Sequence, residues 1–221
     1  MDTLFYALAV ILAGGILPLL LYRHFKVMKA SAVIATAIGS LLGLMALLPA
    51  LQDTGPPTTT WAWQQFLTLT FSLDSLSVFF LIPIFLICPL AALYGFHYMD
   101  KSEEAWRIAV NYCCLSLLIV SMVLVVCADS LMTFALAWEL MSLTSYFLVV
   151  HEFHKKETRA AGYLYFVFAQ AGAMCIFAAF GLIFSATGSF AFDGLDQLPS
   201  RLKLAVFILV LLGCGSKAGI F

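Results

Sequence analysis

The chain has 221 residues, of which 63% are hydrophobic and only 10% are charged, and its formal net charge is −1. Soluble domains carry about 25% charged and about 45–50% apolar residues, so this composition excludes a soluble globular protein and predicts an integral membrane protein. A nearly neutral chain also lacks the excess of basic residues that contacts phosphates, so we expect no nucleic-acid partner.

The first apolar segment, Leu4 to Leu21, is long enough to span a bilayer as a helix. Asp2 is acidic where a secretory signal peptide is basic, so we do not interpret this segment as a cleaved signal. The basic residues that follow it are typical of a first helix that starts outside the cytoplasm. They are Arg23, Lys26 and Lys29.

Six more apolar segments follow, and none alternates between polar and apolar residues as the strands of a membrane barrel do. The pattern predicts an all-α integral membrane protein with about seven transmembrane helices. In chain order the helices run from Leu4 to Leu21, Ala30 to Leu51, Leu73 to Phe96, Ile108 to Cys127, Leu131 to Val150, Ala161 to Thr187, and Leu202 to Phe221. We assign residues 1–107 to an N-terminal three-helix region and residues 108–221 to a second region.

Cations gather in the connections after the first, third and fifth segments, whereas the connections on the opposite side carry mostly aspartates. Because cytoplasmic loops are rich in Lys and Arg, this asymmetry predicts a multi-pass protein of the cell inner membrane with an extracytoplasmic N-terminus. The connection from Gln52 to Thr70 is then an extracytoplasmic polar loop.

Small residues at every fourth position of the second segment predict a close contact with a neighbouring helix, at Ala35, Gly39 and Gly43. Asp74 and the pair Asp129-Ser130 lie at predicted helix starts, where we expect helix capping. The six cysteines lie in or beside apolar segments, so we expect core residues rather than disulfides or metal ligands.

Glu139 lies in the middle of the fifth apolar segment. At about 1.5 Å per residue it would lie roughly 14 Å into a hydrocarbon slab about 30 Å thick. A charged group there costs about 2.5–3.5 kcal/mol on insertion scales, so it must be paired, hydrated or protonated. Ion movement is one interpretation, and a structural carboxylate bonded to a neighbouring helix is the other.

Lys217 is the other deep ionisable residue, about 22 Å along the seventh segment. The surrounding heptad GCGSKAG, residues 213–219, holds three glycines and predicts a broken helix, a feature from which transporters build ion sites. The alternative is a lysine that snorkels to the membrane surface. The heptad does not match a phosphate-binding loop, so nucleotide binding is rejected.

A carboxylate and an ammonium close together in hydrocarbon would stabilise each other's charge. Their separation would then govern how readily Lys217 releases a proton, and movement of Glu139 would act as a pumping element. Three further residues are candidates for a proton path. Gln170 lies inside the sixth segment, where interhelical hydrogen bonding explains it at least as well. His151 and His154 lie at the end of the fifth segment, where a solvated loop is the favoured explanation.

Four stretches resemble a known family: FSLDSLSVFF at 71–80, WELMSLTSYFLVV at 138–150, AGYLYF at 161–166 and GCGSKAG at 213–219. Together they are similar to the antiporter-like proton-translocating subunits of respiratory complex I, cation/proton antiporters and membrane-bound hydrogenases. The fifth and sixth segments are most similar to the hydrogenase-4 and formate hydrogenlyase branch.

The resemblance implies that Glu139 and Lys217 correspond to the family's glutamate and to its lysine on a broken helix, which serve a cytoplasmic half-channel. It also implies a subunit without a redox cofactor, driven by other membrane and peripheral subunits. Family members are considerably longer and contain two inverted repeats, so residues 108–221 would be part of the first repeat and the chain an incomplete protein.

The sequence thus predicts a proton-translocating membrane subunit of a redox-driven complex, of the hydrogenase or NADH-quinone oxidoreductase type. Two alternatives remain open. One is a structural membrane anchor for a soluble redox module, and the other is a cation/proton antiporter component that moves protons and sodium.

Overall fold

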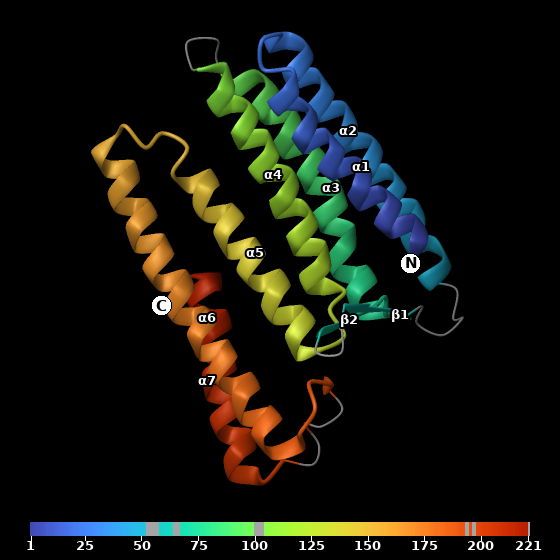
Figure 1. Cartoon of the computed structure of the whole chain (residues 1–221), viewed down its shortest axis with the longest axis vertical. Coiled ribbons are helices and arrows are strands. Elements are labelled where there is room, and N and C mark those ends of the chain that lie inside the picture. Colours follow the sequence, from blue (N-terminus) through green and yellow to red (C-terminus); the bar gives the residue numbers. More distant parts are fainter. Residues whose placement is uncertain (52–57, 64–66, 100–103, 193–194, 196–197, 221) are drawn as a thin grey trace. The chain divides into compact units, whose positions relative to one another are not determined.

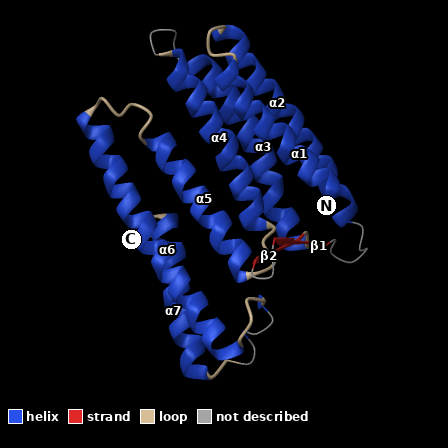
Figure 2. Cartoon of the chain, viewed as in Figure 1, coloured by secondary structure: helices blue, strands red, loops and turns tan. Residues whose placement is uncertain are grey.

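The computed structural model describes residues 1–51, 58–63, 67–99, 104–192, 195 and 198–220. The described chain is almost entirely helical (Figure 2). It divides into two compact units, and each is described by itself. Unit 1 comprises residues 1–59 and 72–127, and unit 2 comprises residues 60–71 and 128–221.

Unit 1 is a bundle of four long helices, seen in blue and green in Figure 1. They are α1 (Asp2–Leu20), α2 (Phe25–Leu47), α3 (Ser75–Tyr98) and α4 (Ala105–Val126), and the short 3-10 helix η1 (Leu48–Leu51) follows α2.

The small residues of α2 make the close contacts predicted for them. A Cβ atom on Gly39 would lie 2.9 Å from the Ala7 carbonyl oxygen of α1, and Ala35 faces Gly14 of the same helix. Gly43 faces the ring of Phe85 on α3. The prediction is confirmed, because a larger side chain at Gly39 would meet backbone that cannot move aside.

Unit 2 holds three helices, α5 (Leu131–Val149), α6 (Lys156–Thr187) and α7 (Ser200–Ala218), of which α6 and α7 lie side by side (Figure 1). Strands β1 (Thr58–Trp63) and β2 (Leu67–Ser72) form a two-stranded sheet. Strand β2 is fixed to the start of α5. The Asp129 amide donates to the Thr70 carbonyl at 2.9 Å, and the Thr70 amide donates to Oγ1 of Thr133 at 3.0 Å.

All seven predicted helices are present. Helices α2 and α6 start earlier than expected, at Phe25 and Lys156 rather than at Ala30 and Ala161. Hydropathy marks where a helix enters the hydrocarbon, whereas the backbone stays helical through the polar turn outside it. Six of the described helices are long and apolar enough to cross a membrane, and α7 is not among these six.

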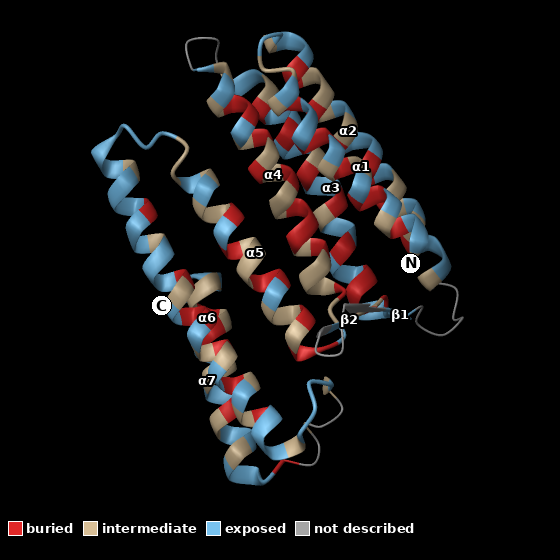
Figure 3. Ribbon diagram, in the orientation of Figure 1, coloured by how far each residue is buried: buried red, intermediate tan, exposed pale blue. Residues whose placement is uncertain are grey.

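The exterior of the helices is apolar, as expected for a multi-pass membrane protein. Large apolar side chains lie exposed along them, including Leu20 at 72%, Phe79 at 67% and Tyr163 at 71% exposure (Figure 3). Such a surface is stable against lipid and not against water.

Both predicted caps are present. Asp74 accepts a hydrogen bond from the Ser77 amide at 2.7 Å at the start of α3, and Ser130 accepts one from the Thr133 amide at 3.2 Å at the start of α5. The hydrogen bonds from Ser77 hold the pKa of Asp74 below its ordinary value.

The polar connection that begins at Gln52 contains two strands in its described part, residues 58–63 and 67–72, and these strands were not predicted. Residues 52–57 and 64–66 lie outside the described chain. The signal was present in the alternation of polar and apolar residues in LTLTFS and in the threonines and tryptophans of TTTWAW, residue types that are typical of strands.

The break expected inside the heptad 213–219 is not found, because α7 continues to Ala218. The helix ends at Gly219, which has the left-handed φ of 71° that favours glycine at this position. Gly213 instead allows close packing, since a Cβ atom there would lie 2.8 Å from the Gly172 carbonyl oxygen of α6. Gly213 therefore serves a helix contact, and the helix ends at Gly219, the last residue of the heptad.

Candidate functional site

The ammonium group of Lys217 lies among hydroxyl groups of the two other helices of unit 2. Its Nζ donates to Oγ of Ser142 at 3.1 Å and to the Tyr165 hydroxyl at 3.2 Å, with a longer contact to Oγ of Ser145 at 3.5 Å. Ser142 and Ser145 belong to α5, and Tyr165 belongs to α6. We refer to Ser142, Ser145 and Tyr165 as the hydroxyl cluster.

Two aromatic rings flank the same ammonium. Nζ of Lys217 lies 5.8 Å from the ring centroid of Trp138 and 5.7 Å from that of Tyr165. Each such contact stabilises a cation by about 0.5–2 kcal/mol, more where water is excluded. Lys217 therefore points into unit 2 and does not extend toward the membrane surface as a snorkelling lysine would.

Glu139 lies one helical turn before the hydroxyl cluster on α5. Its carboxylate accepts a hydrogen bond from Nε2 of Gln170 on α6, at a long distance of 3.4 Å. Gln170 thus contacts one of the two predicted proton-transfer residues. On its other side Glu139 reaches a cavity of about 400 Å³ whose remaining lining is apolar and includes Leu136, Phe177 and Phe180.

Glu139 and Lys217 do not form an ion pair, although the structure describes both residues. The ammonium is bound at the level of Ser142 and Ser145, three and six residues after Glu139, which corresponds to about 5–9 Å of rise along α5. The hydroxyl cluster binds the ammonium in place of the carboxylate.

His151 and His154 lie in the turn that joins α5 to α6, beyond the end of α5 at Val149. His154 is exposed, and its carbonyl accepts a hydrogen bond from Arg159 at 3.0 Å. Nearby, Lys155 pairs with Glu152 at 2.7 Å. The structure thus puts both histidines near the end of α5 at which the hydroxyl cluster lies, but outside that cluster.

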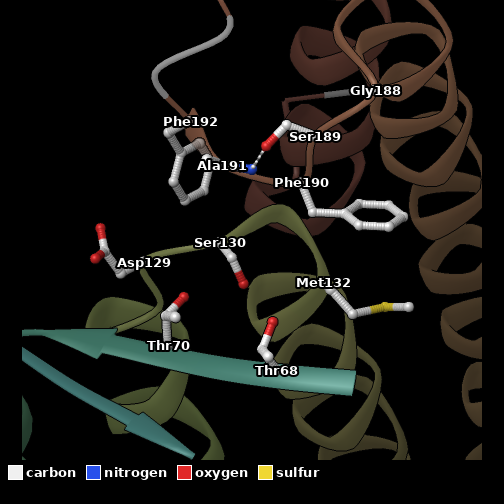
Figure 4. Close-up of a pocket in the computed structure, with 10 residues that line it drawn as sticks. All are labelled: Thr68, Thr70, Asp129, Ser130, Met132, Gly188, Ser189, Phe190, Ala191 and Phe192. Carbon is white, nitrogen blue, oxygen red and sulfur yellow. Dashed lines mark hydrogen bonds between the residues drawn. The ribbon is translucent and has the colours of Figure 1, made fainter. Parts of the chain in front are cut away.

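A second cavity of about 470 Å³ lies at the opposite end of α5 (Figure 4). Its lining comes from β2, from the start of α5 and from the segment after α6, and it includes Thr70, Asp129, Ser130 and Ser189. Ser189 is also bonded within its own segment, since its Oγ accepts from the Ala191 amide at 3.1 Å. The cavity gives unit 2 a polar opening at the end of α5 remote from Lys217.

Tyr165 and Trp138, the two aromatic residues around Lys217, are candidate functional-site residues that the sequence does not predict. Both lie inside the stretches that carry the family resemblance, but an aromatic residue in an apolar segment has no distinguishing signal of its own. The available signal was the combination of a lysine inside an apolar segment with Ser142, Thr144 and Ser145 in the second half of α5, which favours a hydroxyl or aromatic partner on the neighbouring helix.

Part of the chain matches the model of a known protein family. Residues 128–221 match the family model described as NADH:quinone oxidoreductase/Mrp antiporter, transmembrane. These residues include α5, α6 and α7, so they contain Glu139, Gln170 and Lys217.

Two curated relatives cover most of the chain. It is 36% identical to hydrogenase-4 component B of Escherichia coli K12 over 157 residues, 70% of this chain and 23% of that protein. It is 29% identical to an Na(+)/H(+) antiporter component of Alkalihalophilus pseudofirmus, over 74% of this chain and 21% of that protein. The chain thus spans about a quarter or less of the length of these relatives.

A solved structure matches nearly the whole chain. A chain of the membrane-bound sulfane sulfur reductase, an archaeal respiratory membrane complex, superposes with a TM-score of 0.78 at 26% identity, over 97% of this chain and 34% of that one. By these matches the resemblance drawn from the sequence is confirmed, and the chain is related to the antiporter-like membrane subunits of hydrogenase, Mrp antiporter and NADH:quinone oxidoreductase assemblies.

Proposed function

We propose that this chain belongs to a proton-translocating membrane subunit of a redox-driven complex, of the hydrogenase or NADH-quinone oxidoreductase type. Electron transfer in partner subunits would drive proton movement through Glu139 and Lys217. In this proposal the subunit lies in the cell inner membrane with its N-terminus outside, and it carries no redox cofactor of its own.

The observation that carries the proposal is the position of Lys217. Its ammonium is bound within unit 2 by groups of α5 and α6, beginning with Ser142 one helical turn along α5 from Glu139. A charged lysine inside the hydrocarbon region costs about 2.5–3.5 kcal/mol on insertion scales, so a purely structural chain gains nothing by keeping it there. Intramembrane ionisable residues of this kind are typical of proton relays.

Gln170 has a supporting role in this proposal, because it bonds the Glu139 carboxylate and limits the positions that the carboxylate can take. His151 and His154 would exchange protons between the cytoplasm and the end of α5. Histidine suits this task because its ordinary pKa lies near 6.5.

Two substitutions test the proposal in membrane vesicles that contain the assembled complex. Glu139→Gln and Lys217→Ala should each reduce the initial rate of proton translocation by at least about tenfold, while the chain still assembles. Glu157→Gln and Lys156→Ala are matched controls in the exposed first turn of α6 and should leave the rate unchanged.

If both site variants translocate protons at the wild-type rate, the chain is a structural anchor and the proposal is wrong. The antiporter alternative is favoured by the similarity to a component of an Na(+)/H(+) antiporter. It predicts proton movement that requires sodium on the opposite side of the membrane and continues without electron transfer.

A further inference from the structure

The groups that bind Lys217 are unusual in that all three are hydroxyls. Ser142, Ser145 and Tyr165 can each either accept or donate a hydrogen bond, whereas a carbonyl or a carboxylate can only accept one. An ammonium has three N–H donors and no acceptor, and a neutral amine also has a lone pair that needs a donor. A hydroxyl cluster therefore suits both charge states of the lysine.

The cluster is also connected internally. The Tyr165 hydroxyl lies 2.5 Å from Oγ of Ser145, and Ser145 in turn donates to the Met141 carbonyl at 2.7 Å. A continuous chain of hydrogen bonds thus runs from Nζ of Lys217 through Tyr165 to Ser145. Glu139 lies outside this chain, because the described contact of its carboxylate is with Gln170.

We propose that Tyr165 and Ser145 are the proton-transfer residues of Lys217, through which its proton is exchanged with water at the end of α5 where Ser145 lies. The inference rests on the proposed function and adds the path that the proton takes. Tyr165 contacts the reacting nitrogen directly, and Ser145 connects Tyr165 to the outside.

The proton balance is simple. The Nζ–H bond of Lys217 breaks and its proton passes to the Tyr165 oxygen, while the phenolic proton of Tyr165 passes to the Ser145 oxygen. The Ser145 hydroxyl proton then leaves to a water molecule. One proton leaves, Lys217 changes from ammonium to amine, and both hydroxyls stay neutral.

The return of a proton uses the same chain in reverse: a water molecule gives a proton to the Ser145 oxygen, the Ser145 hydroxyl proton passes to the Tyr165 oxygen, and the phenolic proton passes to the amine of Lys217. When Lys217 is charged, Tyr165 accepts from Nζ and donates to Ser145, which donates to the Met141 carbonyl. When Lys217 is neutral, Ser145 donates to Tyr165, and Tyr165 donates to the amine. No heavy atom needs to move, so the site holds the lysine in one position through both states.

The position of Ser145 fits an exit on this side. It lies four residues before the end of α5 at Val149, about 6 Å of helical rise, and the turn that follows carries His151 and His154. Ser142 bonds the ammonium but has no described contact with Tyr165, so it positions the lysine and is not a link in the path.

The experiment compares hydroxyl removals in membrane vesicles that contain the assembled complex. Tyr165→Phe keeps the ring beside the ammonium and removes only the hydroxyl, and Ser145→Ala removes the second link. We expect each to slow proton translocation by at least about tenfold at unchanged assembly. Tyr163→Phe and Ser185→Ala, at exposed positions on the same helix α6, should have no effect.

A second measurement separates proton transfer from a structural role of the hydroxyl. Difluorotyrosine at position 165 keeps the hydroxyl and loses its proton more readily than tyrosine does. It should shift the pH profile of the translocation rate to lower pH, whereas the same analogue at position 163 should not. If Tyr165→Phe does not assemble, this variant still tests whether the Tyr165 hydroxyl takes part in proton transfer.

The outcomes distinguish the two proposals. If Lys217→Ala abolishes translocation but Tyr165→Phe retains the rate and difluorotyrosine leaves the pH profile unchanged, the proposed function stands and this path is overturned. If Lys217→Ala itself retains translocation, the proposed function fails, and this inference fails with it.

Discussion

Each unit contains a lysine whose ammonium lies near two aromatic rings. The two lysines differ in the groups that accept hydrogen bonds from them. Lys29 in unit 1 is 5% exposed, donates to the Met99 carbonyl at 2.7 Å and lies 4.8 and 5.0 Å from the rings of Phe25 and Phe96. Lys217 in unit 2 has two aromatic neighbours as well, but its hydrogen-bond acceptors are hydroxyls.

The difference indicates a different role for each lysine. Met99 is the C-cap residue that follows α3, so the Lys29 ammonium binds a carbonyl at a helix C-terminus, where the helix dipole also favours a cation. A carbonyl cannot donate to a neutral amine, so this contact suits a permanently charged structural lysine. The hydroxyl cluster around Lys217 accommodates either charge state, which a proton-transfer residue requires.

The largest expected effect is on proton translocation, and it should distinguish the two lysines when each is replaced by methionine. Lys217→Met should reduce proton translocation by at least about tenfold, since it removes the titrating group. Lys29→Met should leave translocation per assembled chain unchanged but lower the free energy of unfolding by about 1.5–3 kcal/mol, because it removes the charged donor from the Met99 carbonyl. Translocation in vesicles and thermal denaturation in detergent measure the two effects.

Lys217→Met should destabilise the chain less than Lys29→Met does. The hydroxyls that lose the lysine can bond each other, as Tyr165 and Ser145 already do, whereas a carbonyl such as that of Met99 cannot replace a lost donor by rotating. Equal losses of stability and of translocation in the two variants would contradict the assignment of different roles.

The next effect concerns the packing that holds Lys217 in place. A Cβ atom on Gly172 of α6 would collide with Oγ of Ser216 and lie 2.9 Å from the Gly213 carbonyl oxygen. Gly172→Ala should therefore separate α6 from α7 and lower the free energy of unfolding by about 1–3 kcal/mol. It should also slow translocation, since Lys217 follows Ser216 directly.

The matched control is Gly181→Ala on the same helix, because no atom lies within 4 Å of a Cβ built at Gly181. Alanine has the higher helix propensity, so this variant should be neutral or more stable by up to about 1 kcal/mol. A Gly172→Ala variant as stable as Gly181→Ala would show that α6 and α7 do not require this close contact.

These contacts mark the limit of what the sequence could predict. Hydropathy was sufficient to predict the seven helices, six of which are long and apolar enough to cross a membrane, because a long apolar run in a bilayer has few other stable structures. The spacing of small residues at every fourth position was sufficient to predict the α2 contacts at Gly39 and Gly43. The hydrogen-bonding capacity of Asp and Ser at a helix start was sufficient to predict the caps at Asp74 and Ser130.

Partners between helices could not be predicted in the same way. The sequence indicated Glu139 and Lys217 as a pair, but the ammonium binds Ser142 and Tyr165, because rotation of a helix about its axis decides which neighbours a long side chain reaches. The glycines around Lys217 were interpreted as a helix break for a related reason. Glycine lowers helix propensity, yet a tight contact such as that of Gly213 with Gly172 selects glycine within an intact helix.

The smallest expected effect is the loss of stability on removing a helix cap, either the charged cap of α3 or the neutral cap of α5. Asp74→Ala in unit 1 and Ser130→Ala in unit 2 should each lower the free energy of unfolding by about 1 kcal/mol at pH 7. Because the folded chain lowers the pKa of Asp74, its carboxylate contributes stability above the unfolded pKa near 4 and loses it as pH falls through the lowered value. The Asp74→Ala difference should therefore shrink below about pH 4, and the Ser130→Ala difference should not. Denaturation in detergent at pH 7 and pH 3 measures both differences. If the Ser130→Ala difference also shrinks at pH 3, the pH dependence seen with Asp74→Ala comes from general acid destabilisation and not from the cap.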